Sequence, residues 1–401
     1  MVKSNKKLNR IYMDYASGVK ANPSSIHAEG VKAKIKLQNA HKEVASILHV
    51  QSSEIIFTSG GTESNNLAIQ GVVLAWQGNN LPHIITTNIE HPSVLETCKM
   101  LQKRKLAEIS IVSVEKNGIV DSKKIKKEIK KNTILVSVMY ANNEIGTIQP
   151  IREIAKEIRH YKKFISYKLK AMSYPLFHTD AVQAVNYLDL NVEKLGVDML
   201  SMSGSKIEGA GRVGVLYRKK TVPLLSIFGG GDQEMGLRPG TENLAEIVKF
   251  SEALKLVQKN KEKENERLTK LRDYFIKKLS KGTTGIIING DLKNRLPNNI
   301  NITFPKIPSD LLVVELSAKG IMASSKSACK SSHKEGSYVI EAIHSAEALL
   351  PLISGSKASA EIDSEIGGVR FSLGKDTTKA DIDYTVKALS QILQKLNKWY
   401  T

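Results

Sequence analysis

The chain has 401 residues, enough for two domains with a large core, and its 41 % hydrophobic content is typical of a globular protein. No apolar run reaches the roughly 18 residues that a membrane span needs, and no apolar stretch follows the basic N-terminus as a secretory signal would require. The two cysteines, Cys98 and Cys329, are too few for a disulfide framework, which favours a reducing, cytoplasmic setting.

The net charge is +19, but the lysine-rich runs alternate with apolar residues at helical spacing. We therefore interpret them as solvated helix faces rather than as a nucleic-acid-binding surface.

The first third of the chain predicts alternating strands and helices. A strand at 53–57 runs into a glycine-rich loop that opens a helix. Backbone N–H groups at a helix start bind anions, so Gly61 and Thr62 are candidate phosphate ligands, with a plain tight turn as the alternative. A second strand, 84–87, ends shortly before His91, where parallel α/β sheets collect their ligands. His91 could stack on a cofactor ring and move protons, although a lone histidine is more often structural.

A dense polar cluster follows the β-branched strand 133–139. It reads Tyr-Ala-Asn-Asn-Glu-Ile-Gly over 140–146, which is unusual for a simple connection. Asn143 in this cluster could hydrogen-bond a ring hydroxyl or a substrate carboxylate. A helix is predicted over 151–160, and the basic, aromatic segment 161–175 behind it is interpreted as an insertion without assigned chemistry.

The segment 177–218 carries the strongest chemical signal in the chain. Two short strands in it end in polar residues, the first in Asp180 and Gln183, the second in Ser203, Ser205 and Lys206. A lysine beside a carboxylate suits pyridoxal phosphate, because the lysine amine condenses with the cofactor aldehyde while the carboxylate keeps the pyridinium nitrogen protonated. A surface lysine and a helix-capping aspartate are the alternative.

Three further candidates lie in the second half of the chain. Thr241 belongs to a glycine-rich loop that could reach a phosphate or a neighbouring subunit. Cys329 lies among serines between Lys326 and Lys330. Nearby lysines favour the nucleophilic thiolate, with an incidental exposed thiol as the alternative. Arg370 lies on a short predicted strand, where its guanidinium could hold a substrate carboxylate or form a surface salt bridge.

Long helices are predicted over 243–258 and 259–281, with no helix-breaking residue between them, and the sequence pattern changes near residue 257. We therefore predict a large domain over 14–257 and a smaller domain that combines 1–13 with 258–401.

Together, these motifs resemble those of the cysteine desulfurases of the NifS/IscS group, class V of the fold-type-I pyridoxal phosphate enzymes. The resemblance extends from Tyr12 to about Tyr384. It rests on the order and spacing of TSGGTESNNLAI, EHPSV, NNEIGTIQP, HTDAVQ, the GLR-x-GTEN loop and SACKS. It implies an α/β fold, with a mostly parallel seven-stranded sheet in the large domain and a smaller α+β domain that carries the cysteine loop.

The resemblance also implies how pyridoxal phosphate is held. The cofactor-binding residues would be Gly61, Thr62, His91, Asn143, Asp180, Gln183, Ser203, Ser205, Lys206 and, from the second subunit of a homodimer, Thr241. Among them, Lys206 would form the Schiff base, Asp180 would pair with the pyridinium nitrogen and His91 would stack on the ring. The resemblance implies no metal site, although Cys329 could transiently contact an iron–sulfur cluster.

The reaction implied by the resemblance converts L-cysteine to L-alanine. Asn143 and Arg370 would hold the substrate carboxylate, and Cys329 would attack the substrate sulfur and keep it as a persulfide. The sulfur would then pass by thiol exchange to an acceptor that serves iron–sulfur cluster assembly or tRNA thiolation. A selenocysteine lyase or a class V aminotransferase is the enzymatic alternative, and the aminotransferase would not need Cys329. The alternative from another class is a degenerate scaffold that binds a sulfur carrier or tRNA.

The chain departs from the family pattern in four places. Ser205 stands where the family usually has a histidine, and Lys326 replaces a glycine of the cysteine loop. The segment 209–212 reads Gly-Ala-Gly-Arg instead of G-P-K-G, and insertions occur near 161–175 and within 341–366. We expect activity to survive these changes, with weaker affinity for the cofactor.

Overall fold

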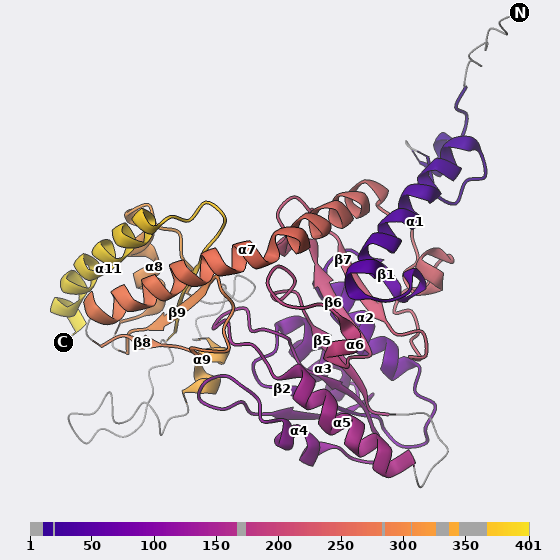
Figure 1. The fold of residues 1–401 in the computed structure, drawn as a ribbon. Coiled ribbons are helices and arrows are strands. Elements are labelled where there is room, and N and C mark those ends of the chain that lie inside the picture. The colour runs from indigo at the N-terminus through magenta and orange to yellow at the C-terminus, as the bar shows by residue number, and fades with distance from the viewer. Residues whose placement is uncertain are drawn as a thin grey trace, which may run out of the picture.

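The computed structural model describes residues 11–18, 21–166, 174–282, 285–305, 307–325, 337–344 and 367–400. Figure 1 shows a larger body and a smaller body, each built around its own sheet, with helix α7 (Leu244–Gly282) running along both. None of the helices in the described ranges combines the length with the apolar character that a bilayer crossing requires.

The larger sheet has seven strands in the order β1-β7-β6-β5-β4-β2-β3. Their bounds are β1 (Ile55–Thr58), β2 (His83–Thr87), β3 (Glu108–Val112), β4 (Thr133–Ser137), β5 (Leu176–Asp180), β6 (Met199–Ser203) and β7 (Gly214–Arg218). Strand β7 pairs antiparallel with both of its neighbours, whereas β2–β3, β2–β4, β4–β5 and β5–β6 are parallel pairs. The predicted mostly parallel seven-stranded sheet is therefore confirmed. The carboxyl ends of β1, β2, β4, β5 and β6 lie along one edge of it, where α/β sheets bind ligands.

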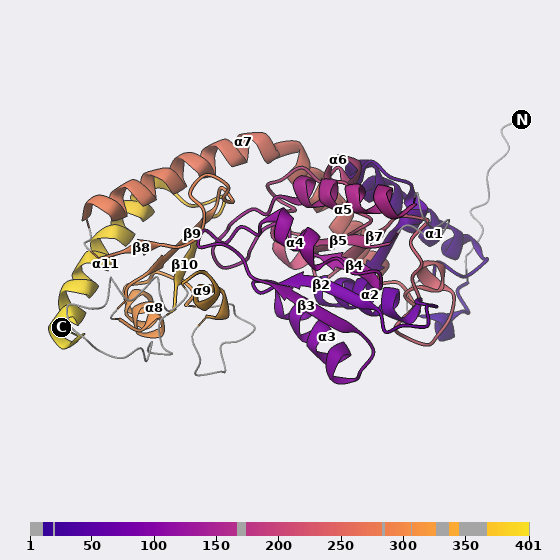
Figure 2. The ribbon, with the colours of Figure 1, turned by 90° about the horizontal axis from the view of Figure 1, so that it is seen from below.

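Helices cover both faces of this sheet because its strands are apolar on both sides. Successive strand residues point to opposite faces, so Ile84 packs into one core and Ile85 into the other. The core that contains Ile84 is covered by α2 (Gly61–Leu74) and α3 (Pro92–Lys103). The opposite core is covered by α1 (Ala28–Leu48), α4 (Ser122–Glu128), α5 (Ile151–Ser166), α6 (Val192–Leu195) and the start of α7, and Figure 2 shows these layers from below.

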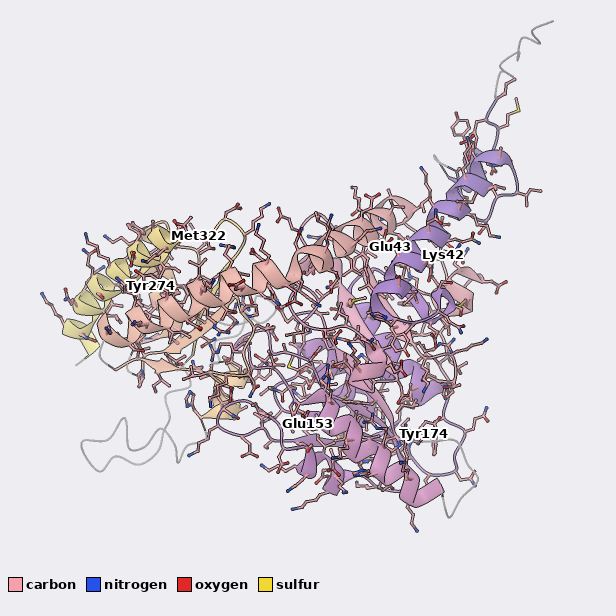
Figure 3. The ribbon with its side chains drawn as sticks, in the orientation of Figure 1. Lys42, Glu43, Glu153, Tyr174, Tyr274 and Met322 are labelled. Atoms are coloured by element: carbon pink, nitrogen blue, oxygen red, sulfur yellow. The ribbon has the colours of Figure 1, made fainter. Side chains whose placement is uncertain are left out.

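The smaller body is an antiparallel sheet of three strands with helices packed against it. The strand order is β10-β9-β8, with β8 (Ile287–Ile288), β9 (Asn299–Thr303) and β10 (Val369–Ser372). Its helices are α8 (Ser309–Ala318), α11 (Lys379–Tyr400) and the second half of α7. On that half, Tyr274 donates a hydrogen bond to Asp383 of α11 at 2.6 Å, and Figure 3 labels Tyr274 beside α11. The smaller α+β unit expected from the sequence is thus present.

Helix α7 is one continuous helix, although the sequence predicts two. Nothing in the sequence breaks it, because no proline or glycine occurs between Leu244 and Lys281. Its first part contributes Leu254 to the core of the larger body, and its second part contributes Leu268 to the core of the smaller one. The predicted boundary near residue 257 falls between these two residues and remains a proposal. The assignment of 1–13 to the smaller domain also remains a proposal. Within the described part of this segment, Tyr12 packs its ring against Tyr15 and against His27 at the start of α1.

Candidate active site

A cavity of about 210 Å³ lies at the carboxyl edge of the larger sheet. The predicted residues that line it are Gly61, Thr62, His91, Asn143, Asp180, Gln183, Ser203, Ser205, Lys206 and Arg370. Ligand sites for drug-sized molecules enclose about 300–1,000 Å³, so this cavity suits a smaller, single-ring ligand. The loops after five parallel strands therefore bring almost all of the predicted site residues together, and Arg370 joins them from β10 of the smaller body.

Asp180 is held in place by two hydrogen bonds. It ends β5, is 6 % exposed, and its Oδ1 accepts a hydrogen bond from the backbone N–H of Val182 at 2.9 Å. Its Oδ2 accepts a hydrogen bond from Nδ2 of Asn65 at 2.6 Å. These two bonds fix the plane of the carboxylate, and the sequence reasoning missed Asn65. The signal was present, because Asn65 lies one helical turn after Gly61 and so shares its face of α2.

A relay of hydrogen bonds connects Asn65 to His91. Asn65 Nδ2 donates to Ser93 Oγ at 2.8 Å, and Ser93 Oγ lies 2.8 Å from His91 Nδ1. The same Nδ1 accepts the backbone N–H of Ser93 at 3.1 Å, so the neutral imidazole carries its proton on Nε2. Burial lowers the pKa of His91; Lys206 lowers it further, and Asp180 opposes both. A neutral imidazole of fixed tautomer is suited to stacking on a ring and to exchanging a proton at Nε2.

The start of α2 also lines the cavity. The first N–H groups of a helix have no partner within the helix, and they attract anions. A Cβ on Gly61 would lie 2.8 Å from Val182 Cγ2 and 3.3 Å from Ser203 Cβ, so glycine is needed for this close approach. Ser203 Oγ and Ser205 Oγ are hydrogen-bonded at 2.9 Å beside it. Two hydroxyls and a helix start are the donor set that a phosphate requires.

Lys206 reaches the cavity from the turn after β6. It closes a 3-10 turn, η3 (Gly204–Lys206), that directly follows β6. The Lys206 carbonyl accepts a hydrogen bond from Nδ2 of Asn186 at 2.6 Å, which fixes the backbone of the turn. The side chain lines the cavity together with Asp180, as the sequence predicts.

Arg370 and Asn143 form the third side of the cavity. Arg370 Nη1 donates to the Asn143 carbonyl at 2.8 Å. Arg370 Nε and Asn143 Oδ1 are both buried and have no hydrogen-bond partner among the described residues. Burial lowers the pKa of Arg370, and the nearby Glu144 opposes that effect. Because buried polar groups are normally satisfied, Arg370 Nε suits a ligand carboxylate, whereas the Asn143 Oδ1 suits an N–H or O–H donor of the ligand.

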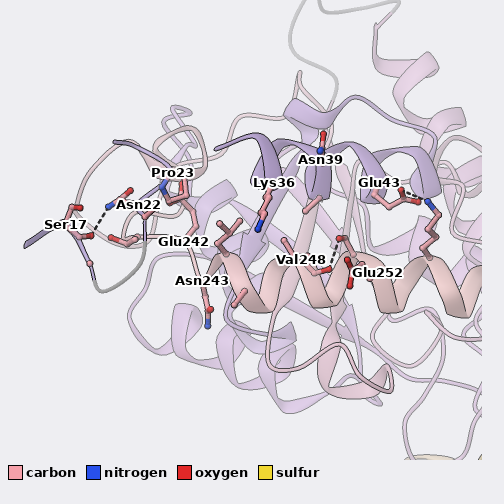
Figure 4. Close-up of a pocket in the computed structure, with 18 residues that line it drawn as sticks. Ser17, Asn22, Pro23, Lys36, Asn39, Glu43, Glu242, Asn243, Val248 and Glu252 are labelled. Atoms are coloured by element: carbon pink, nitrogen blue, oxygen red, sulfur yellow. Dashed lines mark hydrogen bonds and ion pairs between the residues drawn. The ribbon is translucent and has the colours of Figure 1, made fainter. Parts of the chain in front are cut away.

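Two predicted residues are not part of this cavity. Thr241 lines a different cavity, of about 860 Å³, between α1 and the start of α7, which Figure 4 shows in close-up. Cys329 and the neighbouring Lys326 lie outside the described residues. The described chain before them ends at Ser325, and Ser324 forms a β-bridge with Arg370.

Glu90 is a second residue that the sequence reasoning missed. It is fully buried, and its Oε1 accepts hydrogen bonds from Thr87 Oγ1 at 2.7 Å and from the backbone N–H of Met139 at 2.9 Å. Burial raises the pKa of its carboxyl from 4.5 to about 8, and the charge of Asp180 adds to this. Glu90 is therefore protonated at neutral pH.

The Glu90 carboxyl makes the stability of the protein depend on pH. Between pH 4.5 and about pH 8 the unfolded chain releases this proton while the folded chain keeps it, so wild-type stability falls as the pH rises. Glu90→Gln mimics the protonated form and removes this loss. We expect the variant to gain up to about 1.4 kcal/mol of unfolding free energy per pH unit over the wild type across this window. Urea unfolding at about pH 5 and about pH 8 measures it.

The control for this experiment is Glu96→Gln, which changes an exposed carboxyl in an ion pair with Lys99. Its stability difference from wild type should not grow with pH. A constant difference for Glu90→Gln would mean that Glu90 is already ionised in the folded protein.

Comparison with known proteins identifies the family of the chain. Residues 5–385 match the family model for class V aminotransferases, and the chain belongs to this family. The cysteine desulfurase IscS of Dictyoglomus turgidum is 42 % identical over 94 % of this chain and 88 % of that protein. A solved NifS-like protein superposes with a TM-score of 0.79 at 33 % identity, covering 94 % of this chain and 92 % of the other. SspA, solved in complex with cysteine, gives a TM-score of 0.69 at 30 % identity, over 88 % of this chain and 90 % of SspA. The predicted fold-type-I architecture is confirmed by these similarities.

Proposed function

We propose that this chain is a pyridoxal phosphate-dependent L-cysteine desulfurase that forms a persulfide on Cys329. The observation that carries the proposal is the placement of Lys206 and Asp180 on one small cavity, since cofactor chemistry of this kind needs an amine and a carboxylate at opposite ends of one ring. The similarity to proteins named cysteine desulfurase, over 94 % of the chain, supports the same substrate.

The residues present fit the cofactor. The start of α2, together with Ser203 and Ser205, would hold the cofactor phosphate. Asp180 would bind the ring nitrogen of the cofactor, and Gln183 would bind its ring hydroxyl. His91 would stack on the ring. The close approach allowed by Gly61 leaves room at the phosphate end, where a Cβ would meet Val182. When bound, pyridoxal phosphate supplies an aldehyde that links amines covalently and a ring that withdraws electrons from the substrate.

The chain's own residues would then carry the reaction. Arg370 and Asn143 would orient the substrate through its carboxylate, which can accept from Arg370 Nε and from the Asn143 amide N–H. The unpaired Asn143 Oδ1 would accept from an N–H or O–H group of the bound ligand. The Lys206 amine removes and returns the proton at the substrate Cα. The Cys329 thiolate attacks the substrate sulfur, so that an S–S bond forms and the Cβ–S bond breaks. The bonding electron pair stays on Cβ, which takes up a proton and becomes the methyl group of alanine.

The Ser205 hydroxyl replaces the histidine usual in the family, and it is expected to contribute to cofactor affinity. Hydrogen bonds to charged groups contribute about 1.5–3 kcal/mol, so Ser205→Ala should weaken pyridoxal phosphate binding about 10- to 100-fold. Titration of the cofactor-free protein, followed by absorbance, measures this. Ser205→His should bind at least as tightly as wild type, and Ser280→Ala, on an exposed face of α7, should bind like wild type. Unchanged affinity in Ser205→Ala would remove Ser205 from the phosphate site.

A homodimer is the second part of the proposal. The apolar side chains of Met13, Tyr15 and Ile26 are 87, 68 and 96 % exposed at the N-terminal end of the larger body. Beside them lies the cavity that contains Thr241, between α1 and α7, whose helices are tied by the 3.0 Å ion pair of Lys255 with Glu43. Exposed apolar patches of this kind mark protein interfaces. A second copy would cover the patch and bring Thr241 to the phosphate end of its neighbour's cavity.

Mixed dimers test the role of Thr241 across subunits. Thr241→Ala and Lys206→Ala homodimers should each be impaired, because both of their sites lack one of the two residues. A mixed dimer has one site with both residues intact if Thr241 acts on the partner. We therefore expect activity to return to about a quarter of the wild-type level after subunit exchange of equal amounts, since half of the dimers are mixed and half of their sites are complete. No recovery in dimers proved to be mixed would place Thr241 within its own subunit's site.

The sulfur held on Cys329 would pass to an acceptor protein in the cytoplasm that serves iron–sulfur cluster assembly or tRNA thiolation.

The proposed function is tested by incubating the holoenzyme with L-cysteine and a thiol reductant and by measuring sulfide, alanine and cofactor absorbance together. We expect sulfide and alanine in equal amounts. A keto acid without sulfide would indicate an aminotransferase, and turnover of selenocysteine alone would indicate a lyase. Retention on a nucleic-acid column at physiological salt, without cofactor absorbance, would favour a binding scaffold.

A further inference from the structure

The middle strand of the smaller sheet, β9, alternates strictly between polar and apolar residues. It reads Asn-Ile-Asn-Ile-Thr over 299–303. Ile300 and Ile302 pack into the core of the smaller body, so Asn299 and Asn301 lie on the other face of the sheet. The polar face of such a sheet normally meets water, yet these two asparagines are only 4 and 1 % exposed. Their buried amides therefore need hydrogen-bond partners inside the protein.

Both asparagines bind the same backbone carbonyl of the larger body. Asn299 Nδ2 and Asn301 Nδ2 each donate a hydrogen bond to the carbonyl of Glu144 at 3.1 Å. Glu144 directly follows Asn143, which lines the cavity. The contact is close, because a Cβ added to Gly146 would lie 2.6 Å from Asn299 Cβ. Strand β9 thus packs against the loop that carries Asn143 and is bonded to it at the next residue.

Arg370 belongs to the same face of the smaller sheet. In the antiparallel pair of β9 with β10, Arg370 lies directly opposite Asn301. The Cβ atoms of such cross-strand neighbours are about 4.5–5.5 Å apart, and their side chains project from one face. Arg370 Nη1 donates to the Asn143 carbonyl, and Asn301 donates to the next carbonyl along the chain. Side chains of one sheet face therefore fix the loop of Asn143 relative to Arg370.

The Asn301 amide cannot turn away from this bond without losing another. Its Oδ1 accepts a hydrogen bond from Nδ2 of Asn289 at 2.7 Å. Asn289 Nδ2 also donates to Thr303 Oγ1 at 2.8 Å, and Asn289 Oδ1 lies 2.7 Å from Nε2 of His344. Since Asn289 supplies the donor, the Asn301 oxygen faces Asn289 and the Asn301 Nδ2 faces the Glu144 carbonyl.

Helix α9 (Tyr338–Ile343) binds other atoms of the same neighbourhood. Ser337, the N-cap of α9, donates from Oγ to Oε2 of Glu144, and Tyr338 Oη donates to the backbone carbonyl of Glu90 at 2.7 Å. The carboxylate and the carbonyl of Glu144 thus have different partners. Loss of Asn299 or Asn301 would act on the backbone of the loop and leave the bond from Ser337 to the carboxylate in place.

On these contacts we propose that Asn299 and Asn301 are positioning residues for recognition of the substrate carboxylate, a proposal that rests on the proposed function. They hold the Glu144 carbonyl, and with it the adjoining Asn143, where Asn143 and Arg370 can reach one carboxylate together. A carboxylate accepts two hydrogen bonds well only when both donors are correctly placed. Neither asparagine lines the cavity, so both act through the two residues that do.

The test compares two amines that differ only in a carboxylate. The probes are L-alanine and ethylamine, and their binding to the holoenzyme of wild type, Asn299→Ala and Asn301→Ala is followed by cofactor absorbance. Exchange of the Cα proton of L-alanine with deuterated solvent, followed by NMR, gives KM and kcat for the same proteins. Asn265→Ala is the matched control, since Asn265 Nδ2 also donates to a backbone carbonyl, that of Tyr187 at 2.7 Å, and neither residue lines the cavity.

We expect each asparagine variant to weaken L-alanine binding about tenfold, the equivalent of one hydrogen bond, and to leave ethylamine binding unchanged. KM for alanine exchange should rise by the same factor with little change in kcat, because the lost interaction binds the substrate throughout the reaction. Asn265→Ala should behave as wild type. Equal weakening of both amines, or no weakening of either, would overturn the proposal. A variant that no longer holds the cofactor would also overturn it, because its amide would then support the fold as a whole.

The proposed function can fail separately from this positioning role. A wild type that exchanges the alanine proton but releases no sulfide from L-cysteine contradicts the proposed function and leaves the comparison of the two amines in force. A wild type that does both, with asparagine variants that bind L-alanine as tightly as it does, contradicts the positioning role alone. Measurements on the wild type therefore tell the two failures apart.

Discussion

Lys206→Ala should abolish both desulfuration of cysteine and proton exchange of alanine, with a loss of about 10⁴-fold or more. The amine lies on the cavity together with Asp180, and its turn is fixed by the bond from Asn186 to the Lys206 carbonyl. In the proposed reaction, this amine would hold the cofactor covalently and would act as the base that moves the Cα proton. Residues that combine a covalent link with proton transfer show losses of this order when they are removed. Rates at saturating cofactor and the absorbance of bound cofactor measure the effect.

The matched control for this variant is Lys375→Ala. Lys375 pairs with Glu208, two residues after Lys206, but it is exposed and lies outside the cavity. The Lys375→Ala variant should retain wild-type activity. Addition of a small amine to Lys206→Ala should restore part of the alanine exchange, because the cavity keeps Asp180, His91 and the start of α2. Substantial activity in Lys206→Ala without added amine would show that another lysine holds the cofactor.

Cys329→Ala should abolish persulfide and sulfide production, a loss of about 10³-fold or more, while cofactor absorbance and alanine exchange remain at wild-type levels. The thiolate is the only group in the proposed reaction that receives the sulfur, so no other step can replace it. Retention of alanine exchange distinguishes this loss from misfolding. Persulfide labelling of the protein after one turnover is the direct measurement.

Cys98 provides the matched control, because it is the only other cysteine in the chain. It lies in α3 with a fully buried side chain, and burial raises the pKa of its thiol to about 12. A thiol with that pKa is not a nucleophile at neutral pH. Cys98→Ala should therefore keep full desulfurase activity, and loss of sulfide production in Cys98→Ala but not in Cys329→Ala would contradict the assignment of the nucleophile.

The sequence predicted the sheet and the gathering of site residues because both follow from local pattern. Asp180 and Lys206 come directly after apolar strands, and parallel strands place such ends along one edge. The relay through Asn65 and Ser93 was missed because it depends on how α2 and α3 lie against each other, which no local pattern specifies. Glu90 was missed for a different reason. A glutamate in a polar loop is expected to be exposed, and only the packing of the strands around it makes it neutral and buried.

The continuity of α7 was also beyond local reasoning. A helix of 39 residues that changes from one hydrophobic core to another has no uniform apolar face, so its pattern reads as two helices. The hydrogen bonds of Ser337 and Tyr338 could not be predicted from local sequence either. They join residues separated by nearly two hundred or more positions, and only the assembled fold brings them together.

The unbroken α7 gives this chain a sensitivity to length that its loops lack. One residue added between Leu254 and Leu268 would turn everything after it by about 100° and shift it by about 1.5 Å. The smaller body would rotate with the helix, and Arg370 would leave the cavity that Asp180 and Lys206 define. An insertion of about the same size in a surface loop only lengthens the loop, at a small entropic cost. The number of residues in the middle of α7 is therefore as tightly constrained as the identity of any residue in the site, although none of those residues touches the substrate.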